Sequence, residues 1–365
     1  MFLSSFDELR SKILSRATIR TMVHMPYLGK GSTPMGINFG TAATVLENNY
    51  LPQYYGQFSC VRYYETDERG IPTSFPVRNE RLARASAADF KKIPGAPIAY
   101  WVSEKILDTF SGNSFGGSIV TEGQNKTADN DQFLRLCWEV SSGSLGKDRK
   151  WLLYSKGGRY RRWFGNLEYA INWSAEAREY YRRSPSCRII SERFWYKDGV
   201  TWTDIATNGT AFRYLSPNTT FDMKGPTAFL SPTMPIYAAL GLLNSAFVSY
   251  ILPVLNPTMS TQLRDVRSVP LPKTSDWMHD ATPLAARCVL LSRADWDSYE
   301  TSWDFADQPL LRPDFHSGTL AATYDTHRAL WRNLTLEMPA SNGFCGHCGQ
   351  PPREAEIRRL WSQSS

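Results

Sequence analysis

The sequence is poor in features that would assign it to a simple class. It has six cysteines in 365 residues, four of them isolated, so we expect no disulfide framework and a reducing, cytoplasmic location. No charge sign dominates, because 41 Lys and Arg stand against 35 Asp and Glu, and net charge alone therefore indicates no partner. Asp7 and Glu8 occupy the first turn in place of a basic and then apolar region, so we expect no signal peptide.

Long apolar runs are also scarce, with one exception. No charged residue occurs between Lys224 and Arg264, and residues 236–255 are long enough to cross a bilayer. The same segment contains Asn244 and Pro253 and has no basic cluster close to it, which is unusual for a membrane span. We therefore predict one buried helix here and no membrane partner, with a membrane span as the alternative.

Motifs of common catalytic sites are absent. Residues 29–32 (GKGS) lack the earlier glycine and the following helix of a P-loop. Residues 110–114 (FSGNS) approach the Phe-x-Gly-x-Gly loop of methyl-donor enzymes, but Ser114 replaces its second glycine. Neither a Gly-x-Ser-x-Gly elbow nor a His-Glu-x-x-His motif occurs. We therefore assign no catalytic residue.

Two further candidates for chemistry are weak. Residues 345–348 (CGHC) have metal-ligand spacing, but zinc needs four ligands and no second pair lies nearby. We interpret them as part of a polar tail and predict no metal site. His24 ends a predicted strand, and we interpret it as a core histidine rather than a general base.

The chain begins with a pattern typical of an α/β layer. An amphipathic helix is predicted over 6–15, a strand over 19–25, a glycine-rich loop over 26–40, and strands over 41–47 and 57–64. A complete layer would need several earlier strands. The first 66 residues are therefore predicted to be the cut end of a larger sheet.

The remainder is predicted to be α+β and then helical. Residues 67–90 are polar and rich in Arg and Pro, as in a linker, and a helix is predicted over 98–110. Short strands and turns follow, which indicates an α+β domain over 91–272. Residues 280–335 have a helical pattern, so 273–365 is predicted to be mostly helical, with a polar tail whose order stays open.

Positive charge concentrates in residues 147–198, which contain 13 Lys and Arg but six Asp and Glu. Twelve aromatic residues lie in the same block. Cations that neutralise phosphates, beside rings that stack on bases, are typical of a nucleic-acid surface. The alternative is an Arg-rich face whose rings fill a core and whose arginines pair with Glu168, Glu176 and Glu179.

The most specific part of this block is residues 156–166 (KGGRYRRWFGN). Its paired glycines would let the backbone approach a phosphate, and Arg and Asn suit guanine and adenine edges. A weaker basic patch surrounds Phe212 and Phe221. The predicted DNA-binding residues are Lys156, Arg159, Arg161, Arg162, Trp163, Asn166, Arg213 and Lys224.

Five segments occur in order along the chain: 93–101 (IPGAPIAYW), 129–141 (DNDQFLRLCWEVS), 156–173 (KGGRYRRWFGNLEYAINW), 199–230 and 240–272. Together, over about residues 2–312, they resemble the C-terminal portion of the PglX family, the adenine-specific DNA methyltransferases of BREX phage-defence systems. Five independent blocks in a kept order make the resemblance specific. The last fifty residues depart from the family pattern.

The resemblance implies the end of a Rossmann-like methyltransferase domain, 1–66, followed by a target-recognition domain that contacts double-stranded DNA. The full-length family uses S-adenosylmethionine and holds the flipped adenine in an Asn-Pro-Pro-Tyr/Phe loop. The closest string here, residues 256–259 (NPTM), lacks the second proline and the aromatic. The chain alone is therefore expected to be inactive and to bind no S-adenosylmethionine.

Three hypotheses remain open from the sequence. The chain acts with a separately encoded N-terminal methyltransferase half and other BREX proteins, or it is a non-catalytic DNA-binding or specificity module, or it is a truncated product without a role. An adjacent reading frame with the two missing loops would favour the first.

Overall fold

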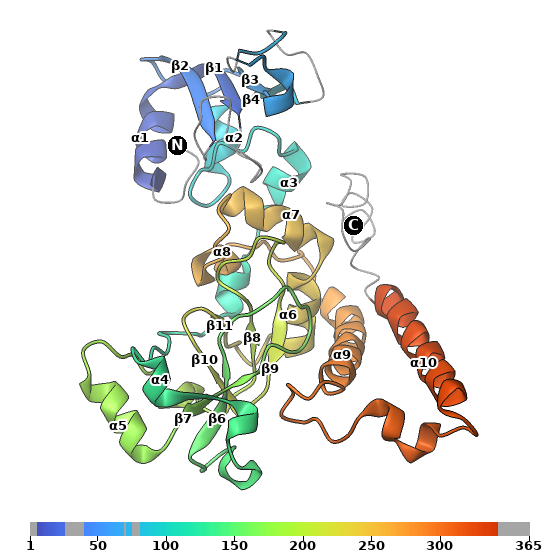
Figure 1. Cartoon of the computed structure of the whole chain (residues 1–365). Helices are drawn as coiled ribbons and strands as arrows, with labels where there is room; N and C mark the ends of the chain where they lie inside the picture. The colour runs from blue at the N-terminus through green and yellow to red at the C-terminus, as the bar shows by residue number, and fades with distance from the viewer. Residues whose placement is uncertain (1–5, 26–39, 69–70, 75–80, 342–365) are drawn as a thin grey trace. The chain divides into compact units, whose positions relative to one another are not determined.

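The computed structural model describes residues 6–25, 40–68, 71–74 and 81–341 (Figure 1). The chain divides into two compact units. Unit 1 is Met1–Asn113 with Val254–Pro257, and unit 2 is Ser114–Pro253 with Thr258–Ser365. Each unit has its own sheet structure and its own apolar core.

Unit 1 is a four-stranded mixed sheet with the strand order β2-β1-β3-β4. Its elements are α1 (Asp7–Arg16), β1 (Thr18–Met25), β2 (Thr41–Glu47), β3 (Gly56–Cys60), β4 (Ala83–Ala85), α2 (Ala87–Lys91) and α3 (Glu104–Thr109). The first helix and the first two strands are confirmed, and the third predicted strand ends early, at Cys60. Only β1 and β3 are parallel, so the origin of this sheet in a Rossmann-like domain stays a prediction.

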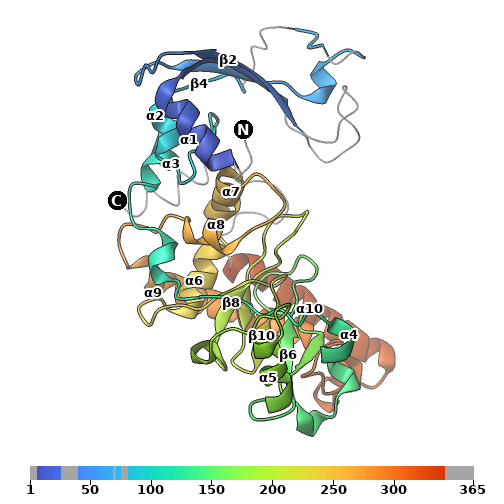
Figure 2. The same cartoon turned by 90° about the vertical axis from the view of Figure 1, so that its left-hand side faces the viewer.

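The core of unit 1 lies where α1 and α2 pack against the sheet (Figure 2). Leu14 of α1, Met22 of β1, Phe58 of β3 and Phe90 of α2 are all buried there. Ser86 begins α2 with a capping box, since its side chain accepts a hydrogen bond from the Asp89 backbone N–H. Both β4 and most of α2 fall inside the predicted linker, 67–90, so part of that segment belongs to the folded unit.

The helix predicted over 98–110 is shorter in the structure. Only residues 104–109 are helical, as α3. Ile98 and Tyr100 are both buried in the core of unit 1 while the backbone around them is irregular. The apolar pattern of this stretch therefore reflects core packing in an extended connection.

Unit 2 contains two small sheets. The first, ordered β10-β6-β7-β5, consists of β5 (Leu134–Leu136), β6 (Trp151–Ser155), β7 (Tyr169–Asn172) and β10 (Thr219–Phe221). The second, ordered β11-β8-β9, consists of β8 (Gly199–Thr201), β9 (Arg213–Leu215) and β11 (Thr227–Ala228). The predicted alternation of short strands and turns is confirmed. The helices α4 (Asn130–Phe133) and α5 (Ala175–Arg183) were not predicted, although Ser174 caps α5.

The prediction of one continuous helix over 236–255 is wrong, although the segment is helical on both sides of a break. Two helices, α6 (Ile236–Leu243) and α7 (Ala246–Leu255), are bent by 69° at Asn244 and Ser245. The buried Asn244 amide accepts a hydrogen bond from the Phe212 N–H at 3.1 Å and donates one to the Phe212 carbonyl at 3.0 Å. Within the described ranges, no single helix has both the length and the apolar composition to span a bilayer. The helices α6 and α7 have that length and composition only when they are counted together, as a bent pair.

The predicted helical region is confirmed in part. Its elements are α9 (Trp277–Trp296) and α10 (Leu320–Ser341), with an irregular connection before α10, while α8 (Leu263–Arg267) precedes the region and was not predicted. In Figure 1, α9 lies against α6 and α10. Arg287 of α9 and Glu337 of α10 form a two-point ion pair at 2.5 and 2.9 Å. The CGHC string at 345–348 lies outside the described residues.

Candidate nucleic-acid interface

The basic segment 156–166 connects β6 to β7, which are antiparallel neighbours. Gly157 and Gly158 have φ values of +83° and +117°, which favour glycine. A Cβ on Gly157 would lie 2.7 Å from the Lys224 carbonyl oxygen, and one on Gly158 would lie 2.8 Å from the Asn166 amide. The close approach for which these glycines are needed is therefore to the protein itself, and not to a phosphate as we expected.

Arg213 lies beneath this segment rather than on its surface. Its side chain is fully buried in β9. Its guanidinium donates to the Arg161 carbonyl and to Thr203 Oγ1, both at 3.3 Å, and no carboxylate pairs with it in the part of the chain that the structure describes. Burial, together with the charge of Arg161, lowers the pKa of Arg213 to about 10. Arg213 supports the loop from inside, so the prediction of a surface contact does not fit this conformation.

Trp163 is also buried, with φ of +72°. The backbone N–H of Trp163 donates to the Phe212 carbonyl at 2.8 Å, and the backbone carbonyl of Trp163 accepts from the Tyr214 N–H at 2.8 Å. These bonds add Trp163 to the edge of β9 in a parallel bridge. The buried ring presents no face for stacking on a base, so its predicted role does not fit this conformation either.

Two other predicted cations are paired with acids. Arg161 Nη1 lies 2.8 Å from Asp295 Oδ2, and its guanidinium lies over the Trp296 ring. Lys224 Nζ lies 3.1 Å from Asp204 Oδ2. The alternative of acid-paired arginines is confirmed at Glu179, which pairs with Arg183 at 2.7 Å, and it applies to Arg161 with a partner other than the expected glutamates.

Of the remaining four predicted residues, one is exposed and three are half-buried. Arg159 is exposed and Lys156 half-buried, with its ammonium 5.6 Å from the centroid of the Tyr169 ring. Arg162 lies over the exposed ring of Tyr160 at 5.8 Å. Asn166 Nδ2 donates to the Arg159 carbonyl at 2.8 Å and so holds the loop closed. This part of the segment presents cations beside rings, as predicted.

Most aromatic side chains of the block 147–198 fill a core instead. Tyr154, Trp173 and Tyr181 are buried in one cluster between the β6–β7 hairpin and α5. Tyr160 and Tyr180 are the block's two members among the exposed large apolar side chains of the described residues, at 45% and 47%. The core-filling alternative is therefore correct for the majority of the rings.

Sequence reasoning counted but did not single out three cations at the other end of the hairpin. Lys147 and Lys150 precede β6, and Arg178 lies on α5. Each lies over an aromatic ring: Tyr196 at 5.7 Å, Trp151 at 5.5 Å and Trp195 at 5.0 Å, respectively. The available signal was the adjacent pair Trp195-Tyr196, because neighbouring rings offer two faces to cations.

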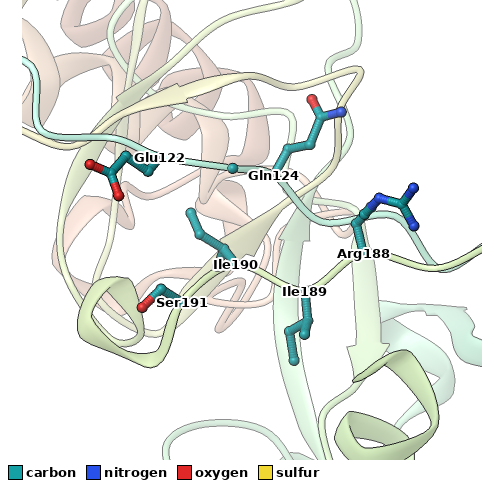
Figure 3. A pocket seen from close by; sticks show the side chains of 7 residues that line it. Glu122, Gln124, Arg188, Ile189, Ile190 and Ser191 are labelled. Carbon is teal, nitrogen blue, oxygen red and sulfur yellow. The ribbon is translucent and has the colours of Figure 1, made fainter. Parts of the chain in front are cut away.

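Two surface depressions among the described residues do not gather a catalytic set. One, of about 460 Å³, lies between residues 122–124 and 188–191. Figure 3 shows the Glu122 carboxylate and the Arg188 guanidinium at opposite sides of it. Glu122 forms an ion pair with Arg193, so it is no obvious general base. A second, of about 550 Å³, lies along α5 and contains none of the predicted DNA-binding residues.

Cofactor and metal chemistry find no support in the described ranges. Gly112 of the FSGNS string would place a Cβ in ordinary contact with one carbonyl, and residues 111–114 are exposed, so they form no cradle for S-adenosylmethionine. No group of three or more His, Cys, Asp or Glu there could hold a metal ion. His24 Nδ1 lies 3.0 Å from Tyr100 Oη, and burial, with the charge of Arg62, lowers its pKa to about 4. His24 is half-buried beside the core residue Tyr100, which favours a hydrogen-bonded structural histidine over a general base.

Comparison with known proteins gives two strong sequence relatives. The chain is 32% identical over 333 residues to the adenine-specific methyltransferase BrxX of Escherichia coli O9:H4 (strain HS), which covers 90% of this chain and 27% of BrxX. It is 29% identical over 334 residues to the adenine-specific methyltransferase PglX of Lacticaseibacillus casei (strain Zhang), with coverages of 85% and 27%. No family model matches.

A structural neighbour is the Type IIL restriction-modification enzyme MmeI in complex with DNA. The TM-score is 0.48 at 11% identity, over 99% of this chain and 48% of MmeI. The chain spans about a quarter of the length of the curated relatives that it matches. The resemblance to a portion of the PglX family of adenine-specific methyltransferases, predicted from the five sequence blocks, is therefore confirmed.

Proposed function

We propose that this chain is the part of a site-specific adenine N6 DNA methyltransferase, of a BREX-type phage-defence system, that recognises DNA. The observation that carries this proposal is the 32% identity to BrxX over 333 residues. The segment 156–166 supports it, because it holds cations beside rings and its residues 158–160 are exposed. Such a loop suits the phosphates and bases of a duplex.

Four side chains of this segment are the proposed contacts. In this proposal Lys156 and Arg159 neutralise phosphates, while Arg162 and Asn166 read base edges, for which their side-chain types are suited. Arg213, Trp163, Arg161 and Lys224 act in this proposal by holding the loop in shape.

The chain alone transfers no methyl group in this proposal. The described residues 110–114 and 256–259 match neither family loop, so S-adenosylmethionine is bound by a part of the enzyme outside this chain. The test is incubation of the purified chain with tritiated S-adenosylmethionine and unmethylated duplex DNA. No label should enter the DNA, and transfer of label by the chain alone would refute the claim of inactivity.

DNA recognition is tested separately, by fluorescence anisotropy with labelled duplexes at low salt. Measurable affinity that falls as salt rises is expected, and no affinity for any duplex would reject the role. A non-catalytic specificity module is the second candidate. It would bind DNA but gain no methylation when a chain with the two missing loops is added, whereas the enzyme part would gain it.

A further inference from the structure

Unit 2 carries a second group of cations that the proposed contacts do not use. Lys147 and Lys150 are exposed in the turn before β6, and Arg178 is half-buried on α5. In the described part of the chain, no carboxylate lies within 4 Å of any of these three charges. Their charge is therefore not neutralised by an ion pair.

Two observations link the three cations: neighbouring rings hold Arg178 and Lys147, and the charges of Arg178 and Lys150 both act on Glu176. Arg178 lies over the Trp195 ring, and Lys147 lies over the neighbouring Tyr196 ring. The Lys150 carbonyl accepts a hydrogen bond of 2.6 Å from the Trp173 N–H, and the Trp173 ring is 5.2 Å from that of Trp195. We call Lys147, Lys150 and Arg178 the ring-held cluster.

The rings hold these cations without using their hydrogen-bond donors. An ion pair occupies the N–H groups of a cation, whereas a ring face attracts its charge and leaves N–H groups available. Trp195 is itself fixed, because its Nε1 donates to the Ile190 carbonyl at 3.0 Å. The cations are thus positioned in advance for an anion, which reduces the entropy cost of binding one.

Acids lie near the cluster as well, and the pKa of one of them, Glu176, is shifted by it. Hydrogen bonds from its own backbone N–H and from Ser174 lower the pKa of Glu176, and the charges of Arg178 and Lys150 add to this effect. Glu176 is fully exposed, so its charge is strongly screened by water. Asp148 is also exposed, so the three cations and the neighbouring Arg149 face two acids screened by water, which leaves the surface positive.

The cluster lies at the opposite end of the β6–β7 hairpin from the loop 156–166. Five residues of β6 separate the two ends, which corresponds to roughly 17 Å at about 3.3 Å per residue. Duplex DNA carries a phosphate charge for about every 1.7 Å of its axis. A duplex lying along the hairpin would therefore place several phosphates between the two ends and others at each end.

We infer that the ring-held cluster binds the phosphodiester backbone of duplex DNA as a second anchor, about one hairpin length from the loop. This inference rests on the proposed DNA recognition by the same chain. It adds phosphate contacts that carry no base specificity and fix the register of the duplex.

The test compares the salt dependence of duplex binding by the full chain and its variants. The double variant Lys147→Gln/Arg178→Gln should weaken binding and lower the slope of log K against log salt by about 1.8, since each lost phosphate contact contributes about 0.9. The variant Arg178→Lys should keep the slope. Thermal unfolding of each variant checks that the fold is retained.

Arg182 provides the matched control. It also lies over Trp195, at 5.6 Å, but it forms an ion pair with Glu192 and lies 3.8 Å from Glu179. Arg182→Gln should leave the slope unchanged. An equal loss of slope in Arg182→Gln and Arg178→Gln would overturn the assignment to the ring-held cluster.

The outcomes separate this inference from the proposed function. If the chain binds duplex DNA and the double variant has the wild-type slope, the second anchor is rejected while recognition by the loop stands. If the double variant lost affinity for heparin but bound duplex DNA with the wild-type slope, the cluster would likewise be rejected as a DNA contact. If the wild-type chain binds no duplex at low salt, both proposals fail.

Discussion

The two ends of the β6–β7 hairpin carry similar side chains but use them differently. At the loop end, half of the predicted contacts serve the fold: Arg213 and Trp163 are buried, and Arg161 and Lys224 are paired with acids. At the other end, three cations lie on rings and have no close carboxylate in the described chain. The chemistry of a cation's neighbour, and not the density of Lys and Arg, separates a structural cation from one available to a ligand.

The largest expected effect concerns the cation buried beneath the loop. Arg213→Ala should lower the free energy of unfolding by about 2–4 kcal/mol, because it leaves a cavity and unpaired carbonyls. Denaturant unfolding measures this loss. If Arg213→Ala kept full stability and lost only DNA affinity, Arg213 would be a direct contact and the contrast between the two ends would disappear.

The glycines of the loop end give the next effect. Gly157→Ala should cost about 1–3 kcal/mol of stability, because its φ is +83° and the new Cβ would meet the Lys224 carbonyl. Gly209 is the control, with the same φ of +83° but no atom within 4 Å of its Cβ position. Gly209→Ala should cost only about 1 kcal/mol. Equal costs in urea unfolding would show that the close packing contributes nothing.

Two loop cations, the exposed Arg159 and the half-buried Lys156, should affect binding rather than stability. Lys156→Ala and Arg159→Ala should each weaken duplex binding about tenfold near 0.1 M salt and reduce the salt slope by about 1. The weakening should be the same for all DNA sequences, whereas Asn166→Ala or Arg162→Ala should reduce sequence preference. Unchanged salt slopes for the first two variants would contradict their assignment to phosphates.

The smallest effect is expected at the paired arginine of the loop. Arg161→Ala should lower the free energy of unfolding by less than about 1 kcal/mol, because its partner Asp295 is largely exposed. Asp295→Ala should have a similar effect on the thermal unfolding midpoint. Neither change should alter the salt slope of DNA binding by as much as Lys156→Ala. If Arg161→Ala reduced the salt slope more than Lys156→Ala, Arg161 would be assigned as a phosphate contact.

Local patterns in the sequence predicted much of the fold. Alternating apolar residues placed β1 and β2 to within a residue, because strand periodicity depends on neighbours along the chain. The break between α6 and α7 could not be predicted, since it depends on the hydrogen bonds between Asn244 and Phe212, which lies 32 residues earlier. Tertiary partners decide such breaks.

The candidate site was predicted less well than the fold. The segment 156–166 was identified as a loop of basic and aromatic residues, but burial of Arg213 and Trp163 depends on β9 beneath it. The ion pairs of Arg161 and Lys224 likewise involve residues 134 and 20 positions away. Composition could not distinguish these cations from Arg159.

The attachment of Trp163 to the edge of β9 has one further consequence. Phe212 accepts from Trp163 and also exchanges two hydrogen bonds with Asn244, so the loop backbone is tied through one residue to the bend of a buried helix pair. A loop backbone held by these hydrogen bonds has little conformational freedom to change when a ligand binds. If the chain recognises DNA as proposed, the duplex rather than the loop would have to deform on binding, which would favour DNA sequences that bend or twist easily.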